Sequence, residues 1–197
     1  MFTGLVEEKG NIVSIKTIQT GKQFIISASQ QFIEKIAIGD SIAINGVCQT
    51  AIKIEGNNFY TDVMQESLKK TTFNILSAKQ NVNLELAMTL NDRLGGHIVQ
   101  GHIDTIGQII QIINNQSLKE FYISYPCEYR KYIVHTGSIS IDGVSLTTAE
   151  IFDRNFKVSL IPHTLSNTIF CDYKVGDRVN IEFDIIGKYI EQMCIKN

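Results

Sequence analysis

Two sets of side chains, one in each half of the chain, have types suited to proton transfer or nucleophilic attack. The second half carries a set of hydroxyl and imidazole groups that could move protons: His102, Ser145, Thr147 and His163. The first half carries a thiol, a hydroxyl and two carboxyl groups: Cys48, Thr50, Asp62 and Glu66. Taken singly, each of these would more often be an ordinary turn or surface residue. Because they recur at equivalent places in the two halves, they favour two related small-molecule sites.

An internal repeat makes these places equivalent. A single offset of 97 residues aligns the first half with the second without a gap, so that Cys48 meets Ser145. The segment Ile42–Thr50 aligns with Ile139–Thr147 in the same register. Self-similarity at a fixed spacing indicates duplicated structural units. The sequence therefore predicts an N-terminal domain, a C-terminal domain and a tail at residues 1–97, 98–186 and 187–197.

Each copy has the pattern of a small antiparallel β-barrel. Short runs rich in β-branched residues, such as Asn11–Ile18, are flanked by glycines. The pairs Asn45-Gly46 and Asp142-Gly143 are strong signals for a hairpin turn. Six short strands and two short helices fit each copy, and closing such a sheet removes its exposed edges. We therefore expect an all-β fold of two tandem six-stranded antiparallel Greek-key-type barrels with short helices, followed by a C-terminal α-helix.

Longer helical patterns lie near the end of each copy and in the tail. The windows Glu66–Leu76 and His163–Tyr173 predict helices at matched places. In the tail, Ile186, Ile190 and Met193 recur at i, i+4 and i+7 and form one apolar stripe. An isolated helix of about a dozen residues is marginal in water, so the stripe must pack on something. Packing on its own barrel and bundling with the tails of other subunits both fit the periodicity.

The composition argues against several classes of protein. With 18 Lys and Arg against 20 Asp and Glu, no Trp and no basic cluster, the chain does not favour a nucleic-acid-binding surface. No window approaches the roughly 18 consecutive apolar residues of a membrane-spanning helix, and the N-terminus lacks the pattern of a secretory signal. We expect a soluble cytoplasmic protein whose 4 cysteines are free thiols.

Metal binding and hydrolase chemistry find little support in the sequence. His97 and His102 have no nearby cysteine, and the glycines beside them favour tight turns over a zinc site. Ser145 lies in Asp142–Thr147, which is not a Gly-x-Ser-x-Gly nucleophile elbow. No metal site is expected.

Several motifs, in order along the chain, resemble the riboflavin synthase family. Those of the first half are Met1–Glu7, Asn45–Thr50 and Asp62–Ser67. Those of the second half and the tail are Arg93–Asp104, Asp142–Thr147, Ile161–Ser166 and Gly187–Tyr189. Because the motifs are numerous and the resemblance runs from Met1 to about Met193, it is specific.

The resemblance implies a reaction and an assembly. The reaction is a dismutation of two molecules of 6,7-dimethyl-8-ribityllumazine. One molecule donates a four-carbon unit to the other, yielding riboflavin and 5-amino-6-ribitylaminouracil without a metal or redox cofactor. The assembly is a homotrimer held together largely by the C-terminal helices, in which the first barrel of one subunit faces the second barrel of a neighbour.

The resemblance also implies which residues contact the substrate. In the first barrel these are Gly4, Leu5, Val6, Cys48, Gln49, Thr50, Asp62, Val63, Met64, Gln65, Glu66 and Ser67. In the second barrel they are Gly101, His102, Ile103, Thr136, Ser145, Leu146, Thr147, Ile161, Pro162, His163, Thr164, Leu165 and Ser166. The family commonly has lysine at the position of Thr136 and an apolar residue at that of Gln49. We therefore expect a weaker or replaced contact at Thr136, and a Gln49 side chain that points away from the substrate.

Four residues are implied as catalytic candidates: Ser145, Cys48, His102 and Asp184. Ser145 and Cys48 are candidates for the nucleophile that adds at C7 of one lumazine, or for groups that orient a water molecule. His102 is a candidate proton shuttle, and Asp184 a candidate general base or positioning group.

The alternative is a non-catalytic lumazine- or flavin-binding protein of the same fold. Such a protein would tend to lose the polar set of one barrel. This chain keeps His97, His102 and the complete Ile161–Thr164 segment, which favours the enzyme.

Overall fold

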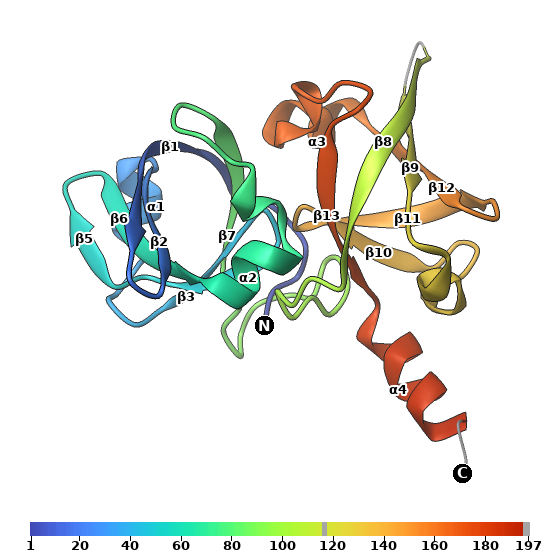
Figure 1. Ribbon diagram of the computed structural model, residues 1–197, viewed down its shortest axis with the longest axis horizontal. Helices are drawn as coiled ribbons and strands as arrows, with labels where there is room; N and C mark the ends of the chain where they lie inside the picture. Colours follow the sequence, from blue (N-terminus) through green and yellow to red (C-terminus); the bar gives the residue numbers. More distant parts are fainter. Residues whose placement is uncertain (116–117, 195–197) are drawn as a thin grey trace.

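The chain folds into two antiparallel β-sheets, one from each half, with a helix at the C-terminus (Figure 1). The computed structural model describes residues 1–115 and 118–194, so the last three residues of the predicted tail lie outside the described residues. The first half contains β1 (Glu8–Ile18), β2 (Gly21–Ser27), β3 (Ser41–Ile44), β4 (Val47–Thr50), β5 (Lys53–Glu55), β6 (Asn58–Met64) and β7 (Asn81–Leu86). The second half contains β8 (Thr105–Asn114), β9 (Lys119–Ser124), β10 (Ser138–Ile141), β11 (Val144–Ile151), β12 (Asn155–Leu160) and β13 (Arg178–Phe183).

The predicted all-β architecture is confirmed, with one difference between the two copies. In the second half, β10-β11-β12-β9-β8-β13 form a closed barrel. In the first half the sheet has seven strands in the order β4-β3-β7-β1-β2-β6-β5 and is not closed, so the prediction of a closed six-stranded barrel is confirmed for the second copy only. The equivalent of β11 is divided here into β4 and β5. We keep the name first barrel for this unit. β11 passes the same point with a bulge between Thr148 and Glu150. A bulge interrupts the hydrogen bonds between neighbouring strands. In the first copy, pairing with β6 after this interruption is limited to Lys53–Glu55.

Each sheet encloses its own apolar core. Phe24 and Phe73 meet edge to face with ring centroids 4.9 Å apart, and Phe121 and Phe170 do the same at 5.1 Å. All four rings are fully buried, and edge-to-face pairs stabilise a core beyond the effect of burial alone. The second pair lies 97 positions after the first, so the repeat extends to individual packing contacts.

The two copies meet through a pair of matched, buried asparagines. Asn83 Nδ2 donates to the carbonyl oxygen of Asp142, and Asn180 Nδ2 donates to that of Asn45, both at 2.9 Å. The side-chain oxygen of each asparagine also accepts a backbone N–H from the opposite half, at 2.9 and 2.8 Å. Because buried amides are costly unless their hydrogen bonds are made, these bonds hold the two barrels in one relative orientation.

The two predicted hairpin turns lie back to back at this contact. A Cβ atom on Gly46 would lie 2.5 Å from the backbone nitrogen of Gly143, and one on Gly143 would lie 2.8 Å from the nitrogen of Gly46. The turn signals in the sequence were correct, but they also mark the place where the two barrels touch.

Each helical window predicted near the end of a copy is divided in two by a threonine. The observed pieces are α2 (Gln65–Lys70) with the 3-10 helix η1 (Thr72–Asn74), and α3 (Pro162–Asn167) with η3 (Ile169–Cys171). Thr71 and Thr168 have extended backbones, and each hydroxyl oxygen accepts the N–H of the phenylalanine two residues on. Because threonine readily forms such local caps, the single helices predicted over Glu66–Leu76 and His163–Tyr173 are wrong in detail. Two further helical pieces within the barrels are α1 (Gln30–Ile33) and η2 (Cys127–Tyr132).

The C-terminal helix α4 (Ile185–Cys194) points away from both barrels (Figure 1). Its apolar stripe is exposed, with Ile186, Ile190 and Met193 at 57%, 56% and 71% exposure. A polar contact ties it to the second barrel, where Lys188 Nζ donates to Asp104 Oδ1 at 2.7 Å. The stripe therefore does not pack on its own barrel. Among the described residues, no helix is long and apolar enough to cross a membrane.

Candidate active site

The short segment before the first strand of each repeat lies against the other barrel. The N–H of Ser145 donates to the carbonyl of Gly4 at 2.7 Å, and the N–H of Cys48 donates to the carbonyl of Gly101 at 2.9 Å. A short antiparallel bridge joins the two segments to each other. Each half of the chain therefore completes the site of the other half.

The expected grouping of substrate contacts is corrected by this exchange. Gly4–Val6 belongs with the second barrel and Gly101–Ile103 with the first, the reverse of the prediction. The packing agrees, since Val6 contacts the core of the second barrel and Ile103 that of the first. The internal repeat could not reveal the exchange, because an alignment pairs equivalent residues and says nothing about which barrel they contact.

Glycine is required at both crossing points. Gly4 and Gly101 have φ values of +76° and +83°, which side chains rarely adopt. A Cβ atom on Gly4 would lie 2.6 Å from Ser145 Cβ, and one on Gly101 would lie 2.5 Å from Cys48 Cβ. At these two glycines the backbone therefore lies too close to Ser145 and Cys48 to leave room for a side chain.

Two matched glutamates hold the crossing segments in place. Glu85 accepts hydrogen bonds from the backbone N–H groups of Thr3 and Gly4 and from the Thr3 hydroxyl. Glu182 accepts from the backbone N–H groups of residues 100, 101 and 102. Burial raises the pKa of Glu85, and it raises the pKa of Glu182 to about 6. Neither glutamate was among the predicted site residues, although their identity at matched positions was a usable signal.

Ser145 forms a short contact with a histidine side chain. Its Oγ lies 2.6 Å from Nδ1 of His97, from the linker between the two copies. Burial lowers the pKa of His97, against the opposing effect of the negative charge on Asp184. The imidazole is therefore neutral at pH 7 and can accept a proton from the serine hydroxyl. The sequence analysis weighed His97 as a metal ligand and counted it among the retained polar residues, but it did not pair it with Ser145. Within the described residues no group of three or more potential metal-binding side chains lies together.

The four predicted catalytic residues fall into two groups. Ser145 and Asp184 lie in the second half, where Asp184 acts electrostatically on His97 and its carboxylate accepts the N–H of Ile186. Cys48 lies in the first half, where its backbone N–H donates to the carbonyl of Gly101. The residue after Gly101 is His102, which is exposed. His102 is therefore on the Cys48 side of the molecule in this chain, not on the Ser145 side.

Comparison with known proteins agrees with this doubled architecture. The lumazine binding domain family matches the chain twice, over residues 3–87 and 100–184. The chain is 43% identical over 196 residues to the riboflavin synthase of Actinobacillus pleuropneumoniae, an alignment that covers 100% of this chain and 91% of that protein. This chain belongs to the riboflavin synthase family. The riboflavin synthase of Bacillus subtilis (strain 168) is 42% identical with the same coverage.

Solved structures show the same fold. The crystal structure of LumP complexed with 6,7-dimethyl-8-(1'-D-ribityl) lumazine has a TM-score of 0.85 and 26% sequence identity, covering 93% of this chain and 99% of that one. LumP complexed with riboflavin has a TM-score of 0.86 and 27% identity, with the same coverage. The resemblance to the riboflavin synthase family that the motifs indicated is confirmed, and with it the prediction of an enzyme.

In this riboflavin synthase homologue, strand alternation decides which predicted contacts can face a ligand. Thr50 and Thr147 are exposed, and Cys48 and Ser145, two residues earlier on the same faces, are half-buried. Gln49 is buried, with its Oε1 accepting from a threonine hydroxyl at 3.5 Å, which agrees with the expectation that it points away. The predicted contacts Cys48, Thr50, Ser145 and Thr147 therefore lie on strand faces that a ligand could reach.

The remaining predicted contacts lie at strand ends and on the following helices. Met64 and Ile161 are each 53% exposed, whereas Val63 is fully buried and can contribute only its backbone. Glu66 forms an exposed ion pair with Lys70 on α2. Asn167 and His163 Nε2 lie 3.1 Å apart on α3. Thr136 is exposed in a left-handed turn, and its hydroxyl donates to the carbonyl of the preceding residue.

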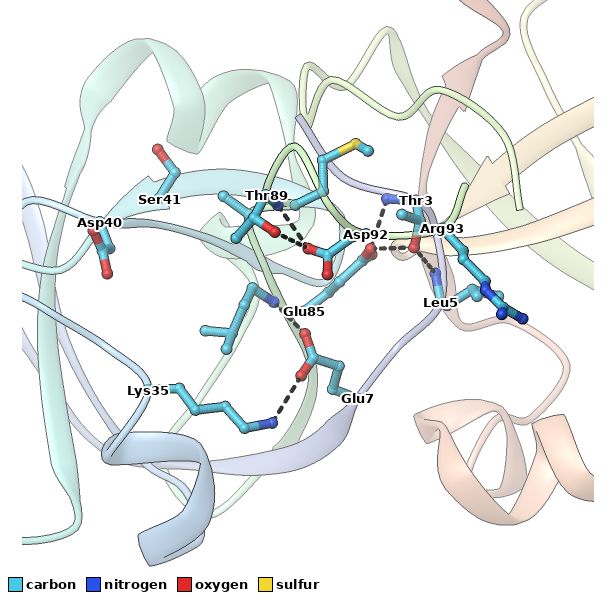
Figure 2. A pocket seen from close by; sticks show the side chains of 13 residues that line it. Thr3, Leu5, Glu7, Lys35, Asp40, Ser41, Glu85, Thr89, Asp92 and Arg93 are labelled. Atoms are coloured by element: carbon cyan, nitrogen blue, oxygen red, sulfur yellow. Dashed lines mark hydrogen bonds and ion pairs between the residues drawn. The ribbon is translucent and has the colours of Figure 1, made fainter. Parts of the chain in front are cut away.

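A large cavity lies elsewhere, beside the first barrel (Figure 2). It has a volume of about 600 Å³ and is lined by residues that include Glu7, Lys35, Glu85 and Arg93. Its only predicted substrate contact is Leu5. Cavities of about 230 and 330 Å³ contain none of the predicted contacts among the described residues. Among the predicted contacts, only Leu5 therefore lines one of these three cavities.

Proposed function

We propose that this chain converts two molecules of 6,7-dimethyl-8-ribityllumazine into riboflavin and 5-amino-6-ribitylaminouracil by transfer of a four-carbon unit. The observation that carries the proposal is the difference between two matched sites. One has a serine hydroxyl hydrogen-bonded to a neutral imidazole, and the other has a thiol, Cys48, for which the described residues supply no imidazole partner. A reaction between two identical molecules needs this kind of asymmetry, because one must act as donor and the other as acceptor.

Each site residue has a defined part in the proposed reaction. Ser145 gives its proton to His97 Nδ1 while its oxygen, or a water molecule that it orients, adds to C7 of one lumazine. His102 moves a proton to or from the 7-methyl group of the other lumazine. Asp184 stabilises the positive charge that develops on His97. The sites hold the two rings in contact, and removing the entropy cost of that encounter lowers the barrier.

The functional assembly is a homotrimer in this proposal. The observation that supports it is the exposed apolar stripe of α4. In the trimer, α4 would bundle with the equivalent helices of two other subunits, and the first barrel of one subunit would face the second barrel of the next. The cytoplasmic location stays a prediction from the sequence.

The decisive experiment mixes the purified protein with the lumazine and follows riboflavin by its fluorescence. We expect riboflavin to accumulate with two lumazines consumed for each riboflavin formed, and a substitution such as Ile190→Asp to shift the protein from trimer to monomer in sedimentation. The alternative, a non-catalytic lumazine- or flavin-binding protein, predicts bound lumazine and no riboflavin.

A further inference from the structure

A buried hydroxyl next to Ser145 has no hydrogen-bond partner. Ser140, on β10, is 1% exposed, and its Oγ finds no partner among the described residues. Burying a hydroxyl without a hydrogen bond is costly, so an orphaned group of this kind needs an explanation. The matched residue of the first copy is Ala43, so the fold itself does not require a hydroxyl at this position.

The strand registers place Ser140 in a row of polar side chains. Ser140 lies directly opposite Ser145 on β11 and directly opposite Glu182 on β13. Side chains of directly opposite residues share one face of the sheet, with Cβ atoms about 4.5–5.5 Å apart. Two serine hydroxyls turned toward each other can close such a gap with a hydrogen bond. The corresponding row of the first copy is Cys48, Ala43 and Glu85, which has no hydroxyl in its middle.

Two side-chain acceptors lie directly opposite Ser140, on Ser145 and on Glu182. Both carboxylate oxygens of Glu182 already accept backbone N–H groups of the crossing segment. Ser145 Oγ contacts the neutral His97, and when the serine donates to that imidazole its lone pairs are free to accept. The hydroxyl of Ser140 can therefore donate to Ser145 Oγ.

We propose that Ser140 is a positioning residue for Ser145: it donates a hydrogen bond to Ser145 Oγ and stabilises the negative charge that develops there as the proton moves to His97. This inference rests on the proposed function. It adds a second group, besides His97, that distinguishes the Ser145 site from the Cys48 site. In this arrangement the Ser140 hydroxyl donates to Ser145 Oγ, and the Ser145 hydroxyl donates to His97 Nδ1.

The test is the variant Ser140→Ala, which copies the residue of the first barrel and should therefore fold. We expect kcat for riboflavin formation to fall roughly three- to tenfold, the effect of losing one ordinary hydrogen bond. KM should stay unchanged, because Ser140 does not touch the substrate. The matched control is Thr72→Val, which removes the other buried unpartnered hydroxyl among the described residues, at the contact between the barrels. This control should leave kcat unchanged.

Each outcome decides the matter. An unchanged kcat in Ser140→Ala, a rise in KM alone, or an equal loss in Thr72→Val would overturn the inference. A melting temperature well below that of the starting protein would assign the hydroxyl to stability and overturn it too. If the unaltered protein forms no riboflavin, the proposed function fails first, and that result is distinct from all of these.

Discussion

The two barrels share a scaffold and differ in the groups that the scaffold presents. Asn83 and Asn180 make the same cross-barrel bonds, and Glu85 and Glu182 hold equivalent crossing segments. At the centre of the sites, however, Ser145 with its imidazole partner stands where the first copy has Cys48. Residues that position the backbone have stayed alike after duplication, whereas residues that could perform chemistry have diverged. A substitution in one barrel can therefore be compared with the same change at the matched position of the other barrel.

The largest effect should come from removing the serine hydroxyl. Ser145→Ala is expected to lower kcat by a factor on the order of 10²–10⁴, the range for a group that takes part in proton transfer. Cys48→Ala, at the matched position without an imidazole partner, should lower kcat only about tenfold. Steady-state riboflavin formation measures both variants. Equal losses would mean that the two sites contribute equally to the chemistry.

The buried carboxyl group of Asp142 should add to the pH dependence of stability in the second copy, because the matched residue of the first copy is Asn45. Burial raises the pKa of Asp142 to about 7, against the opposing effect of the Tyr173 hydroxyl, which donates to it at 2.5 Å. Because the folded-state pKa lies above the unfolded value, the stabilising contribution is complete below about pH 4 and is lost as pH rises to about 7. The loss should amount to at most about 4 kcal/mol.

Urea unfolding between pH 4 and 7 checks this expectation. Asp142→Asn copies Asn45 of the first barrel, and it should flatten the pH dependence of the free energy of unfolding. The reciprocal variant Asn45→Asp should steepen it. An Asp142→Asn protein with the original pH dependence would show that other groups cause the slope.

The matched asparagines should be equally important for joining the barrels. Asn83→Ala and Asn180→Ala each remove two cross-barrel hydrogen bonds and leave buried backbone groups unpaired. Each variant should lose about 2–4 kcal/mol of unfolding free energy. Chemical denaturation measures the losses. A difference of more than about 1 kcal/mol between the two variants would contradict the pseudo-symmetry of the contact.

Two glycine variants should have the smallest effects. Their comparison separates the cost of a steric clash from the cost of a left-handed backbone conformation. Gly39 has a φ of +99°, and a Cβ atom added there would have no neighbour within 4 Å, so Gly39→Ala should cost about 1–2 kcal/mol. Gly101→Ala adds a clash with Cys48 to a similar backbone penalty, which should cost about 1–3 kcal/mol more. Thermal unfolding of the two variants gives the difference. Equal costs would mean that the crossing segment can move away from Cys48.

Much of this molecule follows from local sequence patterns and from the repeat. The offset of 97 residues, the Asn-Gly and Asp-Gly turns and the β-branched runs were sufficient to predict two tandem all-β units. The outward alternation of Cys48 with Thr50 and of Ser145 with Thr147 also follows from the two-residue period of a strand. Strands, turns and strand alternation depend on residues that are close in the sequence, so local sequence patterns are sufficient to predict them.

Contacts between the halves were decided by the tertiary structure alone. The sequence placed Gly4–Val6 in the wrong site, and it did not pair His97 with Ser145, 48 residues later. It also could not show that α4 leaves its apolar stripe uncovered, or that Ser140 stands between Ser145 and Glu182. A repeat shows which residues are equivalent. Only the packing of one barrel against the other determines which of them meet, because those contacts join residues far apart in the chain.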